Sequence, residues 1–275
     1  MSGLRQEFVQ RSITAICLSA VVVALVLFSP NLILNTFVFL LSLALFFEWM
    51  RVSKANRKKK TIFLLLFSFL IFCILGFGAL LEAIPFITML GITAWIVIAF
   101  QIFFREGRLS SSFSFTNFWI GLILISTFCL TCFQFVNGSR LFLLIAIFNV
   151  AIFDSGAYII GKNFGKNSFL PELSPNKTIE GLIGGLASSI VFVTLLYILI
   201  EEVSLKASIA LILSIPFALC GDYFFSFLKR KANIKDTGSI LPGHGGLLDR
   251  VDSHLAGIPM TAFFSHLLYM LGSYF

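Results

Sequence analysis

Long apolar runs separated by short polar stretches dominate the pattern of this chain. Nine of these runs are each close to the roughly 20 residues that a helix needs to cross a bilayer. They lie at residues 12–29, 32–50, 61–81, 83–104, 115–136, 141–161, 178–200, 207–228 and 255–274. Backbone groups in hydrocarbon have no water to bond with, so such runs form helices. We therefore predict an all-α, polytopic integral membrane protein with about nine transmembrane helices.

Composition supports this prediction. Hydrophobic residues make up 58% of the 275 residues and charged residues only 12%, which lies outside the usual range of soluble globular domains. All Lys and Arg residues except Arg140 and Lys206 fall on one side of the predicted membrane. Because cytoplasmic loops carry the excess of basic residues, we predict that the N-terminus is cytoplasmic and the C-terminus is external. The net charge of +7 then reflects topology and contact with anionic membrane lipids, and we expect no nucleic-acid binding.

Polar residues gather in the second half of the chain. We predict that residues 1–140 form a scaffold of transmembrane helices and that residues 141–275 form the catalytic helices, with a cytoplasmic loop at 229–254. The run at 178–200 begins beside two candidate caps, Asn176 and Thr178. Its small residues predict close packing against another helix; they are Gly181, Gly184, Gly185 and Ser188.

Two aspartates stand inside apolar runs, near the ends predicted to be cytoplasmic. A carboxylate within a bilayer is energetically expensive, so each needs a partner or a function. The first, Asp154, lies about two turns inside the run at 141–161. The second is Asp222. Residues at i, i+4, i+7 and i+8 share one face of a helix, so we predict that Asp222 shares a face with Ser226, Lys229 and Arg230. We expect these aspartates to belong to one polar site.

The segment KDTGSILPGHGGLLDRVDS at residues 235–253 is the most polar part of the second half. Its glycines would allow backbone amides to approach an anion closely; they are Gly238, Gly243, Gly245 and Gly246. The three aspartates form a set of oxygen ligands that suits Mg²⁺ bound together with substrate phosphates; they are Asp222, Asp249 and Asp252. Basic residues nearby would bind those phosphates; they are Lys177, Lys229, Arg230, Lys235 and Arg250. The depth of the site predicts that one substrate is a lipid.

Residues 226–252 resemble the signature of the phosphatidate cytidylyltransferase (CDP-diacylglycerol synthase) family. The similarity lies in Ser-x-x-Lys-Arg, Lys-Asp, Pro-Gly-His-Gly-Gly and Asp-Arg-x-Asp, and a second similar block covers residues 154–185, with Asp-Ser-Gly-Ala-Tyr and Ser-Pro-Asn-Lys-Thr-Ile-Glu-Gly. The resemblance implies transfer of CMP from CTP to phosphatidic acid, giving CDP-diacylglycerol and pyrophosphate for phospholipid synthesis. It also implies a bacterial plasma (inner) membrane protein whose active site faces the cytoplasm. CTP, phosphatidic acid and membrane lipids are the expected partners. The sequence is compatible with a monomer or a homodimer.

The resemblance also implies roles for individual residues. The implied catalytic residues are Asp222, Lys229, Arg230, Asp249 and Arg250. The implied nucleotide-binding residues are Lys177, Ser226, Lys235, Asp236, Gly243, His244, Gly245 and Gly246. Mg²⁺ would be held by Asp222 and Asp249 with support from Asp252, and the family is associated with K⁺ beside it. His244 is expected to position the triphosphate; a purely structural role in its turn is the alternative.

One departure from the family pattern concerns Phe225. The family usually has an acidic residue at this position, three residues after Asp222 on the same predicted helix face, so we expect one carboxylate fewer beside the metal. Three other readings remain open. A CTP-dependent kinase of a polyprenol or similar lipid alcohol would need the same groups, a polytopic transporter would share the hydrophobic pattern, and Phe225 is compatible with a catalytically inactive relative.

Overall fold

The computed structural model describes residues 19–53, 62, 83–104, 118–171, 173–238 and 245–271. Within these ranges the chain forms seven long helices, which are α2 (Asn31–Val52), α4 (Ala83–Phe104), α5 (Phe118–Asn137), α6 (Arg140–Phe164), α7 (Ile179–Leu199), α8 (Leu205–Ala232) and α9 (Leu248–Leu271). A shorter apolar helix, Ser19–Phe28, precedes α2. The all-α prediction is confirmed. The run predicted at 61–81 lies almost wholly outside the described residues, so the count of nine stays a prediction.

Six of the described helices, α2 and α4 to α8, are long and apolar enough to cross a membrane. The boundaries around the predicted loop at 229–254 are wrong, because both flanking helices extend beyond their apolar runs. α8 continues through Lys229, Arg230 and Lys231, and α9 already begins at Leu248. α8 ends where Asn233 takes a left-handed backbone conformation with φ of 56°, which asparagine tolerates better than most residues. The connection is therefore 233–247.

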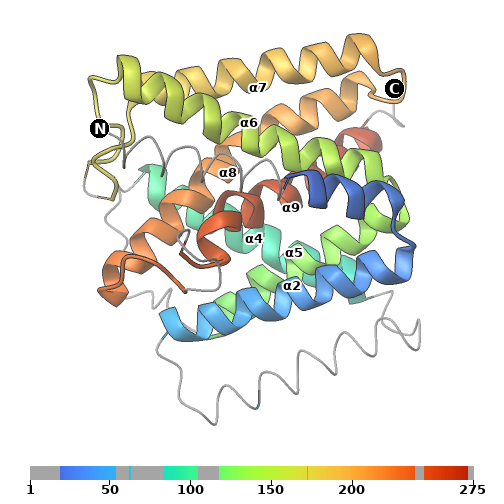
Figure 1. Ribbon diagram of the computed structural model, residues 1–275, viewed down its shortest axis with the longest axis horizontal. Coiled ribbons are helices and arrows are strands. Elements are labelled where there is room, and N and C mark those ends of the chain that lie inside the picture. Colours follow the sequence, from blue (N-terminus) through green and yellow to red (C-terminus); the bar gives the residue numbers. More distant parts are fainter. Residues whose placement is uncertain are drawn as a thin grey trace.

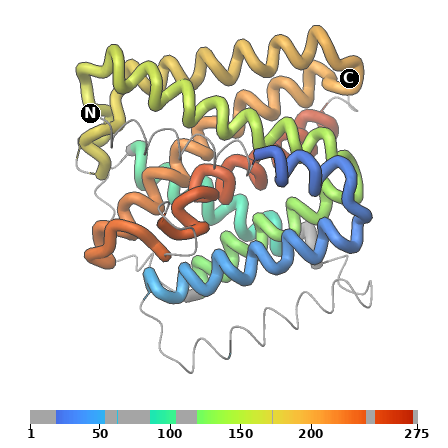
Figure 2. The backbone as a smooth tube through the Cα atoms, in the orientation of Figure 1, coloured from blue at the N-terminus to red at the C-terminus, as the bar shows by residue number. Residues whose placement is uncertain are grey.

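The long helices α8 and α9 lie side by side through the middle of the molecule (Figure 1). A core shared with α2, α4 and α5 covers one side of this pair, and its largest buried side chains include Trp49, Trp95 and Phe224. The pair α6 and α7 covers the other side, where α7 folds back along α6 (Figure 2). The C-terminal ends of α2, α6 and α8 and the N-terminal ends of α7 and α9 consequently meet at one end of the bundle.

Small residues allow α6 and α7 to pack closely, as predicted. A Cβ atom on Gly184 would lie 2.5 Å from the Cβ atom of Ile160, and one on Gly185 would lie 2.7 Å from the carbonyl oxygen of Phe153. Thr178 caps the start of α7, where its hydroxyl oxygen accepts a hydrogen bond of 3.1 Å from the backbone N–H of Gly181. Of the two predicted caps, Thr178 is therefore the one used.

A similar close approach fixes α8 against α9. A Cβ atom on Gly221 would lie 2.5 Å from the carbonyl oxygen of Asp252 and 3.2 Å from the Cβ atom of Ala256. The backbones of the two helices are thus nearly in contact at the level of Asp222 and Asp252. This packing brings two of the predicted site residues to the same place.

The tight α6–α7 contact predicts a clear effect of one added methyl group. We expect Gly185→Ala to reduce the free energy of unfolding by about 1–3 kcal/mol, because overpacking displaces the neighbouring helix. Thermal unfolding of the detergent-solubilised protein would measure this effect. Ala187→Val serves as the control, because Ala187 is exposed on the outer face of α7. Equal melting temperatures for Gly185→Ala and the wild type would contradict the described packing.

Candidate active site

A cavity of about 680 Å³ opens at the end of the bundle where α6, α7, α8 and α9 meet. Its lining includes one aspartate from α6, one from α8 and two from α9; these are Asp154, Asp222, Asp249 and Asp252. Lys162 and Lys177 also line the cavity. Residues from both family-like sequence blocks are therefore neighbours in space, as the sequence predicted.

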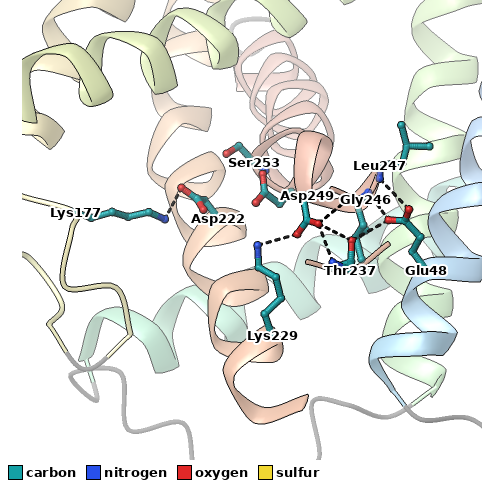
Figure 3. Close-up of polar contacts among 11 residues, drawn as sticks. Glu48, Lys177, Asp222, Lys229, Thr237, Gly246, Leu247, Asp249 and Ser253 are labelled. Carbon is teal, nitrogen blue, oxygen red and sulfur yellow. Dashed lines mark hydrogen bonds and ion pairs between the residues drawn. The ribbon is translucent and has the colours of Figure 1, made fainter. Parts of the chain in front are cut away.

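Lys177 lies in the segment that joins α6 to α7 and reaches across the cavity to α8. It forms an ion pair with Asp222 (Figure 3), and its Nζ atom lies 4.3 Å from the ring centroid of Tyr223. The side chains of Lys177 and Asp222 are 27% and 28% exposed. Both side chains are therefore partly exposed at the cavity, although the Nζ atom of Lys177 is itself buried beside Asp222 and Tyr223.

Glu180 holds this segment in place. Its carboxylate accepts hydrogen bonds from the backbone N–H groups of Lys166 at 3.0 Å and Asn167 at 3.2 Å, and from the side-chain amide of Asn167 at 2.8 Å. The carboxylate joins the first turn of α7 to the residues that follow α6. The contribution of Glu180 is thus to fix the segment that carries Lys177.

Asp249 stands in the first turn of α9 and has partners on both oxygens. Lys229 donates to Oδ1 at 2.8 Å, while Oδ2 accepts from the backbone N–H groups of Thr237 at 2.8 Å and Gly246 at 3.0 Å, and from the Thr237 hydroxyl at 3.0 Å. Asp249 precedes the predicted span at 255–274. Burial alone would raise the pKa of Asp249, but the hydrogen bonds from Lys229 and Thr237 lower that pKa below its ordinary value. The carboxylate is therefore held in its charged form.

The other predicted site residues are distributed unevenly around the cavity. Gly246 contacts Asp249 through its N–H group, and Gly245, with φ of +80°, lies close to Asp236 and Asp249. None of Lys229, Asp236, Gly245 and Gly246 lines the cavity. The same holds for Ser226, which is half-buried, and for Arg230, Lys235 and Arg250, which are exposed. Gly243 and His244 lie outside the described residues.

The structure adds residues that sequence reasoning missed. Thr237, only 1% exposed, contacts Asp249 directly, and its hydroxyl also contacts the carboxylate of Glu48 on α2 at 2.9 Å. Glu48 belongs to the half of the chain expected to be only a scaffold. One signal could have revealed it, because an acidic residue inside an apolar run is costly and usually has a function.

Within the parts of the chain that the structure describes, no three Asp, Glu, His or Cys side chains are grouped closely enough to hold a metal by themselves. The site instead offers aspartate–lysine pairs, Lys177 with Asp222 and Lys229 with Asp249, beside two further aspartates. Such an arrangement suits an anionic ligand, because the lysines can exchange a carboxylate for a phosphate.

The expectation that Phe225 faces the site with Asp222 is wrong. The Phe225 side chain is 1% exposed and packs edge to face against Trp49, with a centroid distance of 6.0 Å, and against Phe224, with 5.4 Å. It does not line the cavity. Residues at i and i+3 differ by about 60° around a helix, and here this difference turns Phe225 towards α2 while Asp222 faces the cavity.

The fold and the cavity define a polytopic membrane protein with an acidic and basic site at one end of its bundle. The chain matches the sequence model of the Cytidylyltransferase family over residues 9–268, and it therefore belongs to this family. The resemblance seen in the sequence is confirmed at this level.

Individual relatives are similar over part of the chain. The phosphatidate cytidylyltransferase of Bacillus subtilis (strain 168) is 43% identical over 113 residues, which are 40% of this chain and 42% of that protein. The phosphatidate cytidylyltransferases of Staphylococcus haemolyticus (strain JCSC1435) and Staphylococcus aureus (strain COL) are each 43% identical over 122 residues, which are 43% of this chain and 46% of each relative. Each match thus spans less than half the length of the relative.

The position of Phe225 predicts the result of restoring an acidic residue there. We expect Phe225→Glu to reduce the free energy of unfolding by at least about 2 kcal/mol, because the carboxylate would be buried against Trp49 and Phe224. Thermal unfolding in detergent would measure the loss. Phe225→Leu, which keeps an apolar side chain, should cost less than about 1.5 kcal/mol. An unchanged melting temperature in Phe225→Glu would show that this side chain reaches the polar cavity.

Proposed function

We propose that this protein transfers CMP from CTP to phosphatidic acid, giving CDP-diacylglycerol and pyrophosphate for phospholipid synthesis. One observation carries the proposal: four aspartates and Lys177 share a single cavity, with Lys229 bound to one of these aspartates, in a chain of the Cytidylyltransferase family. The names of the similar proteins from Bacillus and Staphylococcus support the choice of phosphatidate as acceptor.

Catalysis of this CMP transfer requires mainly electrostatic stabilisation of the reacting phosphates. A phosphate oxygen of phosphatidate attacks the α-phosphorus of CTP, a new P–O bond forms, and the bond from the α-phosphorus to the oxygen bridging to the β-phosphate breaks. Pyrophosphate leaves with that oxygen. Phosphatidate is already anionic at neutral pH, so no dedicated general base is needed. The barrier comes from bringing two polyanions together, and fixed positive groups lower it.

Lysines and arginines would provide these positive groups. Lys177 and Lys229 already form ion pairs with carboxylates at the cavity, and in our proposal each lysine exchanges its carboxylate partner for a substrate phosphate. Arg230 and Arg250 would neutralise phosphates at the exposed side. His244, Ser226, Lys235, Gly243 and Gly245 would complete the nucleotide site, whereas the N–H group of Gly246 is already bound to Asp249.

The donor set also fits a magnesium ion that binds together with the nucleotide. Mg²⁺ in proteins is usually held by one or two carboxylates while substrate phosphates supply further oxygens. Asp222 and Asp249 would hold it, with support from Asp252, and K⁺ beside it is part of the same proposal. When bound, Mg²⁺ neutralises charge on the triphosphate and on the leaving pyrophosphate.

The distribution of basic residues supports a cytoplasmic site in a bacterial plasma membrane. Arg51, Lys162 and the 229–231 cluster lie at the helix ends near the cavity, whereas Arg140 and Lys206 stand in the first turns of α6 and α8 at the opposite end. The positive-inside rule then assigns the cavity end to the cytoplasm. The lipid head group would enter from that leaflet, where CTP is available.

The most direct prediction concerns the reaction itself. Purified protein given CTP, Mg²⁺ and phosphatidate in mixed micelles should form CDP-diacylglycerol and pyrophosphate. Asp222→Asn and Asp249→Asn should each lower kcat by about 100-fold or more, because a carboxylate that would hold Mg²⁺ against the triphosphate is lost. Glu202→Gln in the exposed turn before α8 is the control. Retained activity in Asp249→Asn would remove this residue from the site.

The same assay separates the rival functions by their products. A CTP-dependent lipid kinase would release CDP and a lipid phosphate when given a polyprenol, with no pyrophosphate. A transporter would form neither product. Either result, obtained with folded protein, would contradict the proposed transfer of CMP.

Metal removal gives a separate prediction. Chelation of divalent cations should abolish CDP-diacylglycerol formation, and added Mg²⁺ should restore it, because Lys177 and Lys229 alone leave most of the triphosphate charge unneutralised. Initial rates at increasing free Mg²⁺ would measure this dependence, and K⁺ without Mg²⁺ should not restore activity. Undiminished turnover in the presence of the chelator would contradict the assigned metal role.

A further inference from the structure

Glu48 is a buried acid whose hydrogen bonds reach the connection between α8 and α9 and the first residue of α9. It stands near the C-terminal end of α2 and is only 4% exposed. Its Oε1 atom accepts the backbone N–H of Leu247 at 2.9 Å, and its Oε2 atom accepts the backbone N–H of Leu248 at 2.8 Å and the hydroxyl of Thr237 at 2.9 Å (Figure 3). Both carboxylate oxygens are thus bound to residues about 190–200 positions away in sequence.

Two glycines make room for this carboxylate. A Cβ atom on Gly238 would lie 2.3 Å from Oε1 of Glu48, and one on Gly246 would lie 2.5 Å from Oε2 of Glu48 and 2.2 Å from Oγ1 of Thr237. From the sequence, these glycines were expected to let amides approach a substrate anion. In the structure the anion they accommodate is a side chain of the protein itself.

Glu48 also caps α9 from another helix. The first N–H groups of a helix have no partner within it, and a carboxylate there is favoured by both hydrogen bonding and the helix dipole. Leu248 opens α9, and Asp249 follows it directly. Fixing the N–H groups of Leu247 and Leu248 therefore fixes the backbone from which the Asp249 side chain extends.

Thr237 connects the two carboxylates. Its hydroxyl lies 2.9 Å from Oε2 of Glu48 and 3.0 Å from Oδ2 of Asp249. A hydroxyl has one hydrogen to donate, so its orientation depends on both acids at once. A change at Glu48 is thereby transmitted to the oxygen of Asp249 that faces Thr237, whereas Lys229 binds the other oxygen.

We propose that Glu48 is a positioning residue for the reaction: through Thr237 and the start of α9 it sets the direction in which Asp249 faces the cavity. Glu48 does not itself line the cavity, so it acts through Asp249 and not by contact with substrate. The inference rests on the proposed CMP transfer, and it assigns α2 a part in the site beyond that of a scaffold.

The test compares Glu48→Gln with the wild type in steady-state kinetics, with kcat calculated per folded molecule after size-exclusion chromatography. We expect kcat to fall roughly 10- to 100-fold, the usual effect of losing a group that orients a ligand residue. KM for phosphatidate should stay within twofold, because Glu48 does not contact the cavity. A role in stability alone would reduce the amount of folded protein and leave kcat per folded molecule unchanged.

Variants of Thr237 test the connection itself. Thr237→Val removes the hydroxyl at nearly constant volume and should lower kcat to a similar extent, whereas Thr237→Ser keeps the hydroxyl and should stay close to wild type. The double variant Glu48→Gln/Thr237→Val should be little worse than the poorer single variant, since both changes break one connection. Glu201→Gln, at an exposed glutamate in the turn before α8, is the matched control.

Several outcomes would overturn the inference. A Glu48→Gln protein with kcat within twofold of wild type would do so, as would Thr237→Val with normal kcat or fully additive effects in the double variant. If Glu48→Gln does not fold, the comparison of Thr237→Val with Thr237→Ser decides alone. A folded wild type without CMP transfer refutes the proposed function as well, whereas an active wild type with an equally active Glu48→Gln refutes only the role of Glu48.

Discussion

The bond network of the Glu48 carboxylate at the start of α9 joins the two halves of the chain. Without a partner a buried carboxylate and the free N–H groups of a helix start would each be costly. Placed together they satisfy one another, and Thr237 extends the contact to Asp249. The polar site is thus held by hydrogen bonds that also satisfy the buried carboxylate of Glu48 and the free N–H groups at the start of α9.

The site also depends on close packing between helices. Gly221 lets α8 approach the backbone of α9 at Asp252, and the glycines of α7 let that helix lie directly on α6. These contacts bring aspartates from three helices to one cavity, while Glu180 secures the segment that presents Lys177. Larger residues at these helix contacts would separate the charged groups, so the chemistry of the site depends on the small residues.

Much of the site could be predicted from the sequence, because charges are rare and conspicuous in apolar runs. This reasoning found Asp154 and Asp222, whereas Asp249 and Asp252 came from the polar segment at 235–253 and Lys177 from the resemblance to the family; all five line the cavity. It failed where the answer depends on tertiary contacts. Glu48 is conspicuous as an acid in an apolar run, but no local pattern shows that α2 contacts the start of α9, so its partners could not be predicted. The contact of Phe225 with Trp49 on α2 could not be predicted for the same reason.

In our proposal, the lysines bound to Asp222 and Asp249 are the groups that bind the triphosphate. An experimental structure of the protein with Mg²⁺ and a non-hydrolysable CTP analogue would test it most directly. We predict that the triphosphate lies in the cavity between α6, α8 and α9, with Lys177 and Lys229 in contact with phosphate oxygens. A nucleotide bound elsewhere, or bound while both lysines keep their aspartate partners, would contradict this account.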